Sequence, residues 1–247
     1  MNTNDRIIRL VEVSNFDQIT LHAINVENEV VIKPGERETL TIEACPDVFA
    51  KIKTETQDGQ LNIRMGGSWP EKIRAALATS LTRPQIKYTF TVKKLTDLQI
   101  TGVAHVDVAN IETDRLTVRF SGLGDMNIDA LKAERLDIEQ PMPGACRINA
   151  SGRVTEQHVS LRGMSEYSAD RLESKRATVA LKGPGGHALI RAEDELDITI
   201  SGSGSVEYFG HPRVTKQVSP IGVVTQLLDV EKVAAQGVRE NEYQPRA

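Results

Sequence analysis

The chain has 247 residues, of which 39% are hydrophobic and 26% charged, and its net charge is −4. This mixture is typical of a globular protein and excludes a disordered chain. No cluster of Lys and Arg is present, which excludes the phosphate-binding surface of a nucleic-acid-binding protein. No run reaches the roughly 18 apolar residues of a membrane span, and the first residues lack the apolar core of a signal peptide. The chain is therefore predicted to have no membrane span. Its localisation stays open, because the sequence as numbered is that of a cytoplasmic protein but a trimmed form of an exported protein would look the same.

Residues 1–94 are predicted to form a strand-rich N-terminal unit. Apolar and polar residues alternate through 6–66, which is typical of half-buried strands. Pro-Gly at 34–35 and Asp-Gly at 58–59 mark turns. The unit is either a small cap sheet or a set of degenerate opening rungs. A cap would be useful, because the uncovered end of a strand array recruits other chains.

One segment, residues 69–81, breaks the strand pattern and is predicted to be a short helix inserted near 68–82. Ser68 and Glu71 form a capping box, and Pro70 suits the first helical turn. Apolar residues follow at helical spacing, and they are Ile73, Leu77 and Leu81. The helix is expected to close or flank the solenoid, with docking of a partner as the alternative.

Residues 95–228 contain a repeat of about 20 residues, and each unit includes a glycine-containing bend. Equivalent positions recur every 19–21 residues, and they are Gly102, Gly122, Met142, Gly163, Gly183 and Gly202. Glycine at a bend supplies positive φ or close backbone approach. The glycines assigned to the bends are Gly102, Gly122, Gly124, Gly144, Gly163, Gly183, Gly202 and Gly204.

Apolar residues alternate with polar ones on both sides of each bend, which predicts one inward and one outward face. The inward residues expected before the bends are Leu98, Ile100, Leu116, Val118, Phe120, Leu136, Ile138, Val159, Leu161, Val179, Leu181, Leu196, Ile198 and Ile200. The inward pairs expected after them are Val106 and Val108, Met126 and Ile128, Cys146 and Ile148, Tyr167 and Ala169, His187 and Leu189, and Val206 and Tyr208. The extra glycine before His187 is able to turn its side chain outward instead.

The repeat and the alternation together predict the fold. One rung of two short strands cannot bury its apolar face, whereas stacked rungs share an interior and pair their backbones. The sequence therefore predicts an all-β protein, a parallel β-helix or β-solenoid with rungs of about 20 residues. A β-sandwich would instead favour turn signals at roughly half that spacing. Residues 229–247 are predicted to be a polar, frayed C-terminal tail, with one helical stretch at 229–236.

No residue is predicted to be catalytic, cofactor-binding or metal-binding. Asp107 and Asp129 fall at outward positions, where stacked acids are able to bind calcium, but the nonapeptide calcium repeat is absent. The histidines form no HxH or HExxH pair. Cys45 and Cys146 lie in no CxxC motif, so two separate thiols are expected, with a long-range disulfide as the alternative. Cys146 is expected in one interior column with the residues of its neighbouring units.

Three segments carry a family resemblance. They are ISGSGSVEYFGHPRV (200–214), the opening RLVEVSNFDQITL and TETQDGQLNI (54–63), together with the Ser-Gly-x-Gly bends. They resemble the auto-transporter adhesin head (GIN) domain family of bacteria, a domain of unknown function. The resemblance implies a β-helical, usually exported domain with an adhesive or surface-structural role. It implies no catalytic or ligand residues. The chain departs from the family in lacking an export signal, in its helix and in the bend PMPG (141–144).

Three functions are consistent with these features. The first is a non-catalytic scaffold or binding module of the adhesin-head type, with a protein or a cell-surface glycan as partner. The outward residues expected to carry the contact include Thr117, Arg119, Asp137, Glu139, Thr199 and Glu207. The second is an intracellular, self-assembling structural β-helix, which would be a homo-oligomer. The third is a polysaccharide-active β-helix enzyme, which the 4% aromatic content and the lack of convergent carboxylates disfavour.

Overall fold

A computed structural model describes residues 6–66 and 85–228. The helix predicted over 69–81 and the tail predicted over 229–247 lie outside the described residues. Within the described part, the fold is almost entirely β. Its elements are β1 (Ile7–Val11), β2 (Gln18–Pro34), β3 (Thr39–Ala44), α1 (Pro46–Phe49), β4 (Ile52–Gln57), β5 (Gln60–Met65), β6 (Gln85–Val92), β7 (Asp97–Ala109), β8 (Glu112–Glu139), β9 (Ala145–Arg162), β10 (Glu166–Lys182), β11 (His187–Arg191), β12 (Glu195–Ser201), β13 (Ser205–Phe209), β14 (Arg213–Val218) and β15 (Val223–Gln226).

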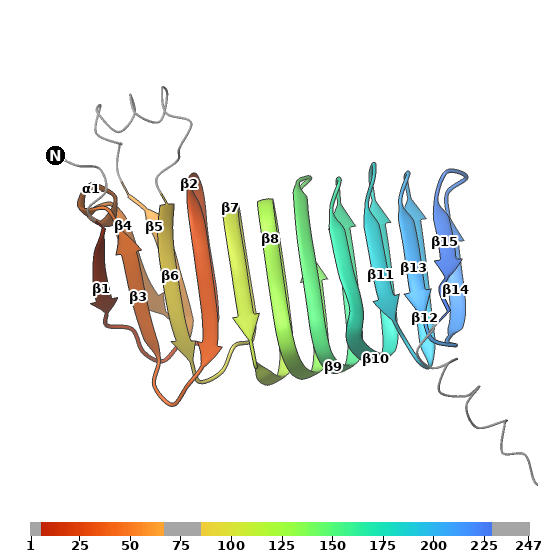
Figure 1. Ribbon diagram of the computed structural model, residues 1–247, viewed down its shortest axis with the longest axis horizontal. Coiled ribbons are helices and arrows are strands. Elements are labelled where there is room, and N and C mark those ends of the chain that lie inside the picture. The colour runs from red at the N-terminus through yellow and green to blue at the C-terminus, as the bar shows by residue number, and fades with distance from the viewer. Residues whose placement is uncertain (1–5, 67–84, 229–247) are drawn as a thin grey trace, which may run out of the picture.

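From β2 and β7 onward the strands pair in parallel and stack as the rungs of one solenoid (Figure 1). Each rung repeats the one before it. Val106 pairs with Met126, Met126 with Ile148, and Ile148 with Tyr167, so steps of about one repeat bring equivalent residues together. The predicted β-solenoid with rungs of about 20 residues is confirmed.

Each rung has three sides, which are exemplified by β7 and the start of β8. The first side (97–101 and its equivalents) precedes the glycine corner, and the second side (105–109) follows it. A second bend at Asn110, with φ 57°, leads into the third side (111–114). Two successive exposed residues, Asp114 and Arg115, then mark the return to the first side of the next rung.

The interior is formed by the inward residues of all three sides, with the third side contributing residues such as Leu131 and Leu172. All fourteen inward residues predicted before the bends are buried. After the bends, predicted inward residues such as Val106, Val108, Cys146 and Ile148 are buried, although Cys146 lies in another column than expected, and His187 and Leu189 are turned outward. Cys146 lies one step earlier, opposite Gly124, and Ile148 takes its expected place beside Met126. His187 is turned outward, and its neighbour Ala188 is buried against Tyr167 and Val206.

At the glycine corner the backbones of successive rungs lie in close contact. At Gly122, φ is 151° and a Cβ would lie 1.8 Å from the carbonyl oxygen of Gly102. At Gly202, a Cβ would lie 2.1 Å from the carbonyl oxygen of Gly183. No side chain fits at such distances, so glycine is required. The residues that follow one another along this column are Gly102, Gly122, Gly144, Gly163, Gly183 and Gly202.

Two details of the corner differ from the predicted repeat. The place expected for Met142 belongs to Gly144, because the segment 141–143 is an exposed loop outside the column. Gly124 lies in the adjacent column, paired with Ala104 and Cys146. Gly204 lies in the same adjacent column, where a Cβ would be 3.0 Å from the carbonyl oxygen of Gly186.

The N-terminal strands extend the solenoid at one end. β2 forms an opening rung, because its first half (18–23) and its second half (27–32) both pair in parallel with β7. β6 adds in parallel to one half of β2, and β3 and β1 follow in antiparallel order. β5 adds to the other half, followed by antiparallel β4. The outermost strands at this end pair antiparallel with their neighbours, whereas those at the opposite end pair in parallel (Figure 1).

The last described rung is formed by β14 and β15. Its inward positions are less apolar than those of the rungs before it, since Lys216 pairs with Ile198 and Gln226 with Tyr208. Exposed apolar residues gather here, and they are Val218, Ile221, Val223 and Leu228. Of the helices in 6–66 and 85–228, none has the length and apolar character to cross a bilayer.

Candidate binding surface

Outward side chains lie in rows that run from rung to rung along the solenoid. The row through Arg135 on the first side alternates in charge through Glu156, Arg176, Glu195 and Arg213, each paired in register with the next. Arg135 lies 3.8 Å from Glu156, while Arg176 contacts Glu156 and Arg213 contacts Glu195. The hydrogen bond from Arg176 lowers the pKa of Glu156. Alternation turns the repulsion expected of stacked like charges into attraction.

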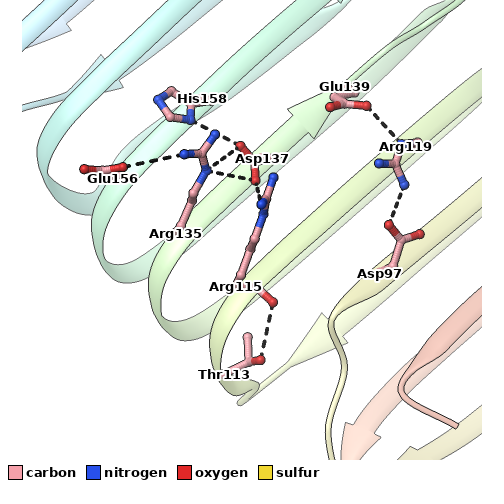
Figure 2. A network of polar contacts seen from close by, with 9 residues as sticks. All are labelled: Asp97, Thr113, Arg115, Arg119, Arg135, Asp137, Glu139, Glu156 and His158. Carbon is pink, nitrogen blue, oxygen red and sulfur yellow. Dashed lines mark hydrogen bonds and ion pairs between the residues drawn. The ribbon is translucent and has the colours of Figure 1, made fainter. Parts of the chain in front are cut away.

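Asp137 is the most buried charge of the first side. Figure 2 shows guanidinium groups from two rungs and an imidazole from a third pointing at its carboxylate. Arg115 Nε lies 2.7 Å from Oδ2, Arg135 Nε 2.9 Å from Oδ1, and His158 Nδ1 3.2 Å from Oδ1. Burial alone would raise the pKa of Asp137, but the hydrogen bonds from Arg135, His158 and Arg115 outweigh it and lower that pKa.

A second series of ion pairs crosses three rungs beside this cluster. Arg119 bridges two acids from the rungs on either side, because it contacts Asp97 and its Nε lies 3.0 Å from Glu139 Oε2 (Figure 2). Burial would lower the pKa of Arg119, and the hydrogen bonds and charges of the two acids raise it overall. The guanidinium therefore remains charged and ties three rungs together.

The outward residues predicted to carry contacts divide into two groups. Thr117 and Asp137 point away from the interior but are buried, with 6% and 4% of their surfaces exposed, so the prediction that they face a partner is wrong. The neighbouring rungs cover them, as the arginines around Asp137 show. Arg119, Glu139 and Glu207 are half-buried, and Thr199 is exposed.

The second side carries its own alternating row. His105 Nδ1 lies 3.2 Å from Asp125, and Arg147 lies 3.7 Å from Asp125 and 3.1 Å from Glu166. The neighbouring outward row consists of Asp107, Asn127 and Asn149. In it the Asn127 amide donates a 2.9 Å hydrogen bond to Asp107, and the Asn149 amide donates a 2.9 Å hydrogen bond to Asn127. In both rows the polar side chains pair with one another, as a rigid flat face requires.

The acids that were candidates for calcium are not stacked on each other. Asp107 pairs in register with Asn127, whereas Asp129 pairs with Ala109 and accepts a 3.1 Å hydrogen bond from Ser151. In the part of the chain that the structure describes, no group of three or more His, Cys, Asp or Glu is arranged to hold a metal ion.

A shallow groove of about 880 Å³ runs along the third side across several rungs. Its floor contains Ala133, Val154 and Ser174, which pair in register and whose small or buried side chains leave the surface hollow. Charged residues of both signs line it, and they include Glu112, Lys132, Glu134, Arg153, Glu173 and Lys175. Arg153 lies 2.8 Å from Glu173. The groove thus offers an extended, polar, ordered surface.

Beneath this groove lies a buried polar network that alternation alone does not predict. Tyr167 donates a 3.1 Å hydrogen bond to Gln157 Oε1, and Gln157 donates a 2.8 Å hydrogen bond to Ser174 Oγ. Ser174 in turn donates to the carbonyl oxygen of Arg191 at 2.7 Å. Burial raises the pKa of Tyr167, so its hydroxyl stays protonated and acts as a donor. The network holds the groove floor on a fixed support.

The candidate nucleophiles are isolated from bases. Cys45 and Cys146 are both free thiols, as expected. Burial raises the pKa of Cys146, whose Sγ lies 3.3 Å from Ser165 Oγ. Outward His187 lies 3.6 Å from Glu207. Among the described residues, no serine or cysteine side chain is hydrogen bonded to a histidine.

Comparison with known proteins agrees with this geometry. Residues 15–212 match the family model described as "Putative auto-transporter adhesin, head GIN domain". No functionally curated protein matches.

Solved bacterial structures share the fold at low identity. A putative adhesin from Bacteroides fragilis is 20% identical, with a TM-score of 0.75 and coverage of 91% of this chain and 98% of that one. A putative lipid binding protein from Parabacteroides distasonis is 19% identical, with a TM-score of 0.65 and coverage of 91% and 98%. A putative adhesin from the same species is 15% identical, with a TM-score of 0.63 and coverage of 90% and 97%. The match to the family model spans most of the chain, which therefore belongs to the auto-transporter adhesin head (GIN) domain family.

Proposed function

We propose that this chain is a non-catalytic binding module of the adhesin-head type, which holds a partner in the groove of its third side. The observation that carries the proposal is the groove itself, of about 880 Å³, lined by charged rows across successive rungs. Its floor is supported by the network of Gln157, Tyr167 and Ser174, so the surface is preorganised. A rigid surface binds with less loss of entropy than a flexible one.

The chemistry of the groove favours an extended and polar partner. Lys132, Arg153 and Glu173 stand in one register row, so a chain lying along the groove meets a regular series of charges. Either a peptide segment of a protein or a charged cell-surface glycan has that form. Family membership supports placing the module outside the cell or on its surface.

Binding is tested with the double variant Lys132→Glu, Arg153→Glu on an array of neutral and acidic glycans and extracellular proteins. We expect the wild-type chain to bind a defined class, and the variant to bind it at least about tenfold more weakly, as expected for two reversed contacts. The matched control is Lys53→Glu, Arg64→Glu, which makes the same charge change at exposed register partners on β4 and β5. Equal loss in the control would contradict a role for the groove.

Catalysis is tested separately with a panel of polysaccharides. The proposal predicts that no reducing ends or unsaturated products accumulate above the buffer level. Product release that the groove variant abolishes would establish the enzyme alternative instead.

A second function, assembly through the ends, is favoured by a different observation. Within the described residues β14 and β15 each pair on one edge alone, and Ile221 and Val223 beside them are exposed. At the opposite end, Ile8 and Leu10 on β1 are exposed as well. Unpaired edges with apolar side chains are templates for strand addition. Sedimentation velocity over a concentration series should show larger species for the wild type and none for Ile221→Asp, Val223→Asp. A single species for both would exclude assembly.

A further inference from the structure

The exposed large apolar side chains fall into three places, and one of them is not an end of the solenoid. Two groups border the N-terminal and C-terminal edges described above. The third consists of Leu123, Met142 and Met164, which are 52%, 54% and 69% exposed and lie in the middle of the array. We call these three residues the apolar ridge. Edge effects do not account for it.

The fold brings the apolar ridge together at the glycine corner. Leu123 directly follows Gly122, and Met164 directly follows Gly163, while Met142 lies in the loop that precedes Gly144. Gly144 bridges to Gly163, and the Met164 amide donates to the Gly144 carbonyl at 3.1 Å, so the three residues occupy consecutive rungs. With roughly 4.8 Å between neighbouring strands, the ridge extends about 10 Å along the corner. This corner leads into β11, β13 and β15 and forms the upper edge of Figure 1.

Two cations flank the apolar ridge without counter-charges. Arg162 and Lys182 are register partners on the first side, directly before the corner, and both are exposed. Neither has an ion-pair partner among the described residues, although the adjoining rows pair their arginines with acids. Stacked like charges oppose folding. The pair therefore does not serve the stability of the sheet, and it stands out on a chain of net charge −4.

We propose that the apolar ridge and the Arg162–Lys182 pair form a site that docks on the surface of an anionic lipid bilayer. The site is a convex corner, so its leucine and methionines project outward and enter a deformable apolar layer rather than receive a rigid partner. The apolar ridge itself contains no aromatic or hydrogen-bonding side chain that would select a particular protein epitope. Adjacent cations attract anionic headgroups, and apolar side chains enter the boundary beneath them.

The experiment is co-sedimentation with extruded vesicles of phosphatidylcholine alone or mixed equally with phosphatidylglycerol. We expect binding to the anionic vesicles, weaker binding in high salt and little binding to phosphatidylcholine alone. The variant Leu123→Ser, Met142→Ser, Met164→Ser and the variant Arg162→Glu, Lys182→Glu should each lose at least about tenfold in affinity, since each basic residue near the surface contributes appreciably. All substituted side chains are exposed, and thermal unfolding of each variant verifies that it is folded.

Two controls separate this site from general stickiness. Lys132→Glu, Arg153→Glu changes the same charge in the groove, and Ile8→Ser, Leu10→Ser removes apolar surface at the N-terminal edge; both should bind vesicles as the wild type does. Equal loss in either control, or no binding to anionic vesicles, would overturn the proposal. So would dissociation of an oligomer by the triple serine variant, because a second copy would then be the occupant. Since the groove variant tests the partner and the ridge variants test lipid, the two proposals can fail independently.

Discussion

The carboxylate of Asp137 points away from the interior and is nevertheless buried, because side chains from neighbouring rungs close over it. Arg115, Arg135 and His158 each approach it from a different strand segment. Its burial is a property of three rungs together. A residue's own alternation tells which way it points but not whether it is covered.

Asp137→Asn should lower the free energy of unfolding by about 2 kcal/mol at pH 7, because hydrogen bonds to charged groups are among the stronger ones. The pKa of Asp137 is lowered in the folded state, so its contribution is present above its ordinary pKa and is lost as pH falls through the folded value. The difference between wild type and variant in urea unfolding should therefore be full at pH 7 and shrink below about pH 4. Asp107→Asn, on the exposed amide row, is the control. A difference that stays constant with pH would contradict the argument.

Ala130 is a second residue whose environment conflicts with its type. Its φ of 53° is a left-handed conformation that costs a non-glycine residue roughly 1 kcal/mol. Ala130→Gly should therefore raise the unfolding free energy by up to about 1 kcal/mol in chemical denaturation. Ala150→Gly, at a buried position in a strand, should lower it by a similar amount. Destabilisation by both substitutions would show that the bend is not strained.

The strand elements are held by one interior column after another, and adjacent residues of a strand differ sharply in what they contribute. Ile198→Ala on β12 should cost about 2–4 kcal/mol, because it leaves a cavity among fully buried neighbours. Thr199→Ala, one residue further and exposed, should cost less than about 0.5 kcal/mol. Denaturant midpoints of the two variants measure this. Similar costs would mean that the assigned phase of the strand is wrong.

The elements also show how much of the fold could be predicted from the sequence. Wherever the bend had a constant length, alternation and the glycine spacing gave the correct inward residues, as in β7 and β12. The errors at Met142 and His187 both arose at bends that contain additional residues, PMPG and GPGGH. Extra residues at an exposed corner cost little, so the chain tolerates them. They shift the register of the strand that follows, by two residues after PMPG and by one after GPGGH, and only the second shift exchanges inward and outward residues.

The candidate site was less predictable than the fold. The groove floor, the Asp137 cluster and the apolar ridge each combine residues about 20 positions apart. How deeply each of these residues is buried depends on the side chain at the equivalent position of the next rung. Charge signs within one repeat do not reveal this. Arg135, Glu156 and Arg176 lie seven residues before the repeat positions Met142, Gly163 and Gly183, so only a comparison across several repeats places them in one row.

At the scale of the whole molecule, the groove and the apolar ridge lie on opposite sides of the solenoid. The glycine corner joins the first and second sides, so it faces away from the third side, which holds the groove. In Figure 1 the segments of the glycine corner lie along the upper edge of the strand array, and the bends that follow the second side lie along the lower edge. A chain that rests its corner on a lipid surface would therefore hold its groove toward the surroundings.

Removing residues 163–182 deletes one whole rung, since Gly163 and Gly183 occupy equivalent places. The deletion brings Glu156 next to Glu195 by removing Arg176 between them. Glu156→Gln should then stabilise the shortened chain, by relieving repulsion, while it destabilises the full-length chain, by breaking the pair with Arg176. Urea midpoints of the four proteins test this reversal of sign. The same sign in both backgrounds would contradict it.

The alternating row of arginines and glutamates imposes an odd–even rule on the growth of this protein. A duplication or loss of one repeat preserves the backbone stacking but sets like charges against each other, whereas a change of two repeats restores the pattern. As far as this row is concerned, genetic changes in length should therefore be accepted most readily in pairs of repeats.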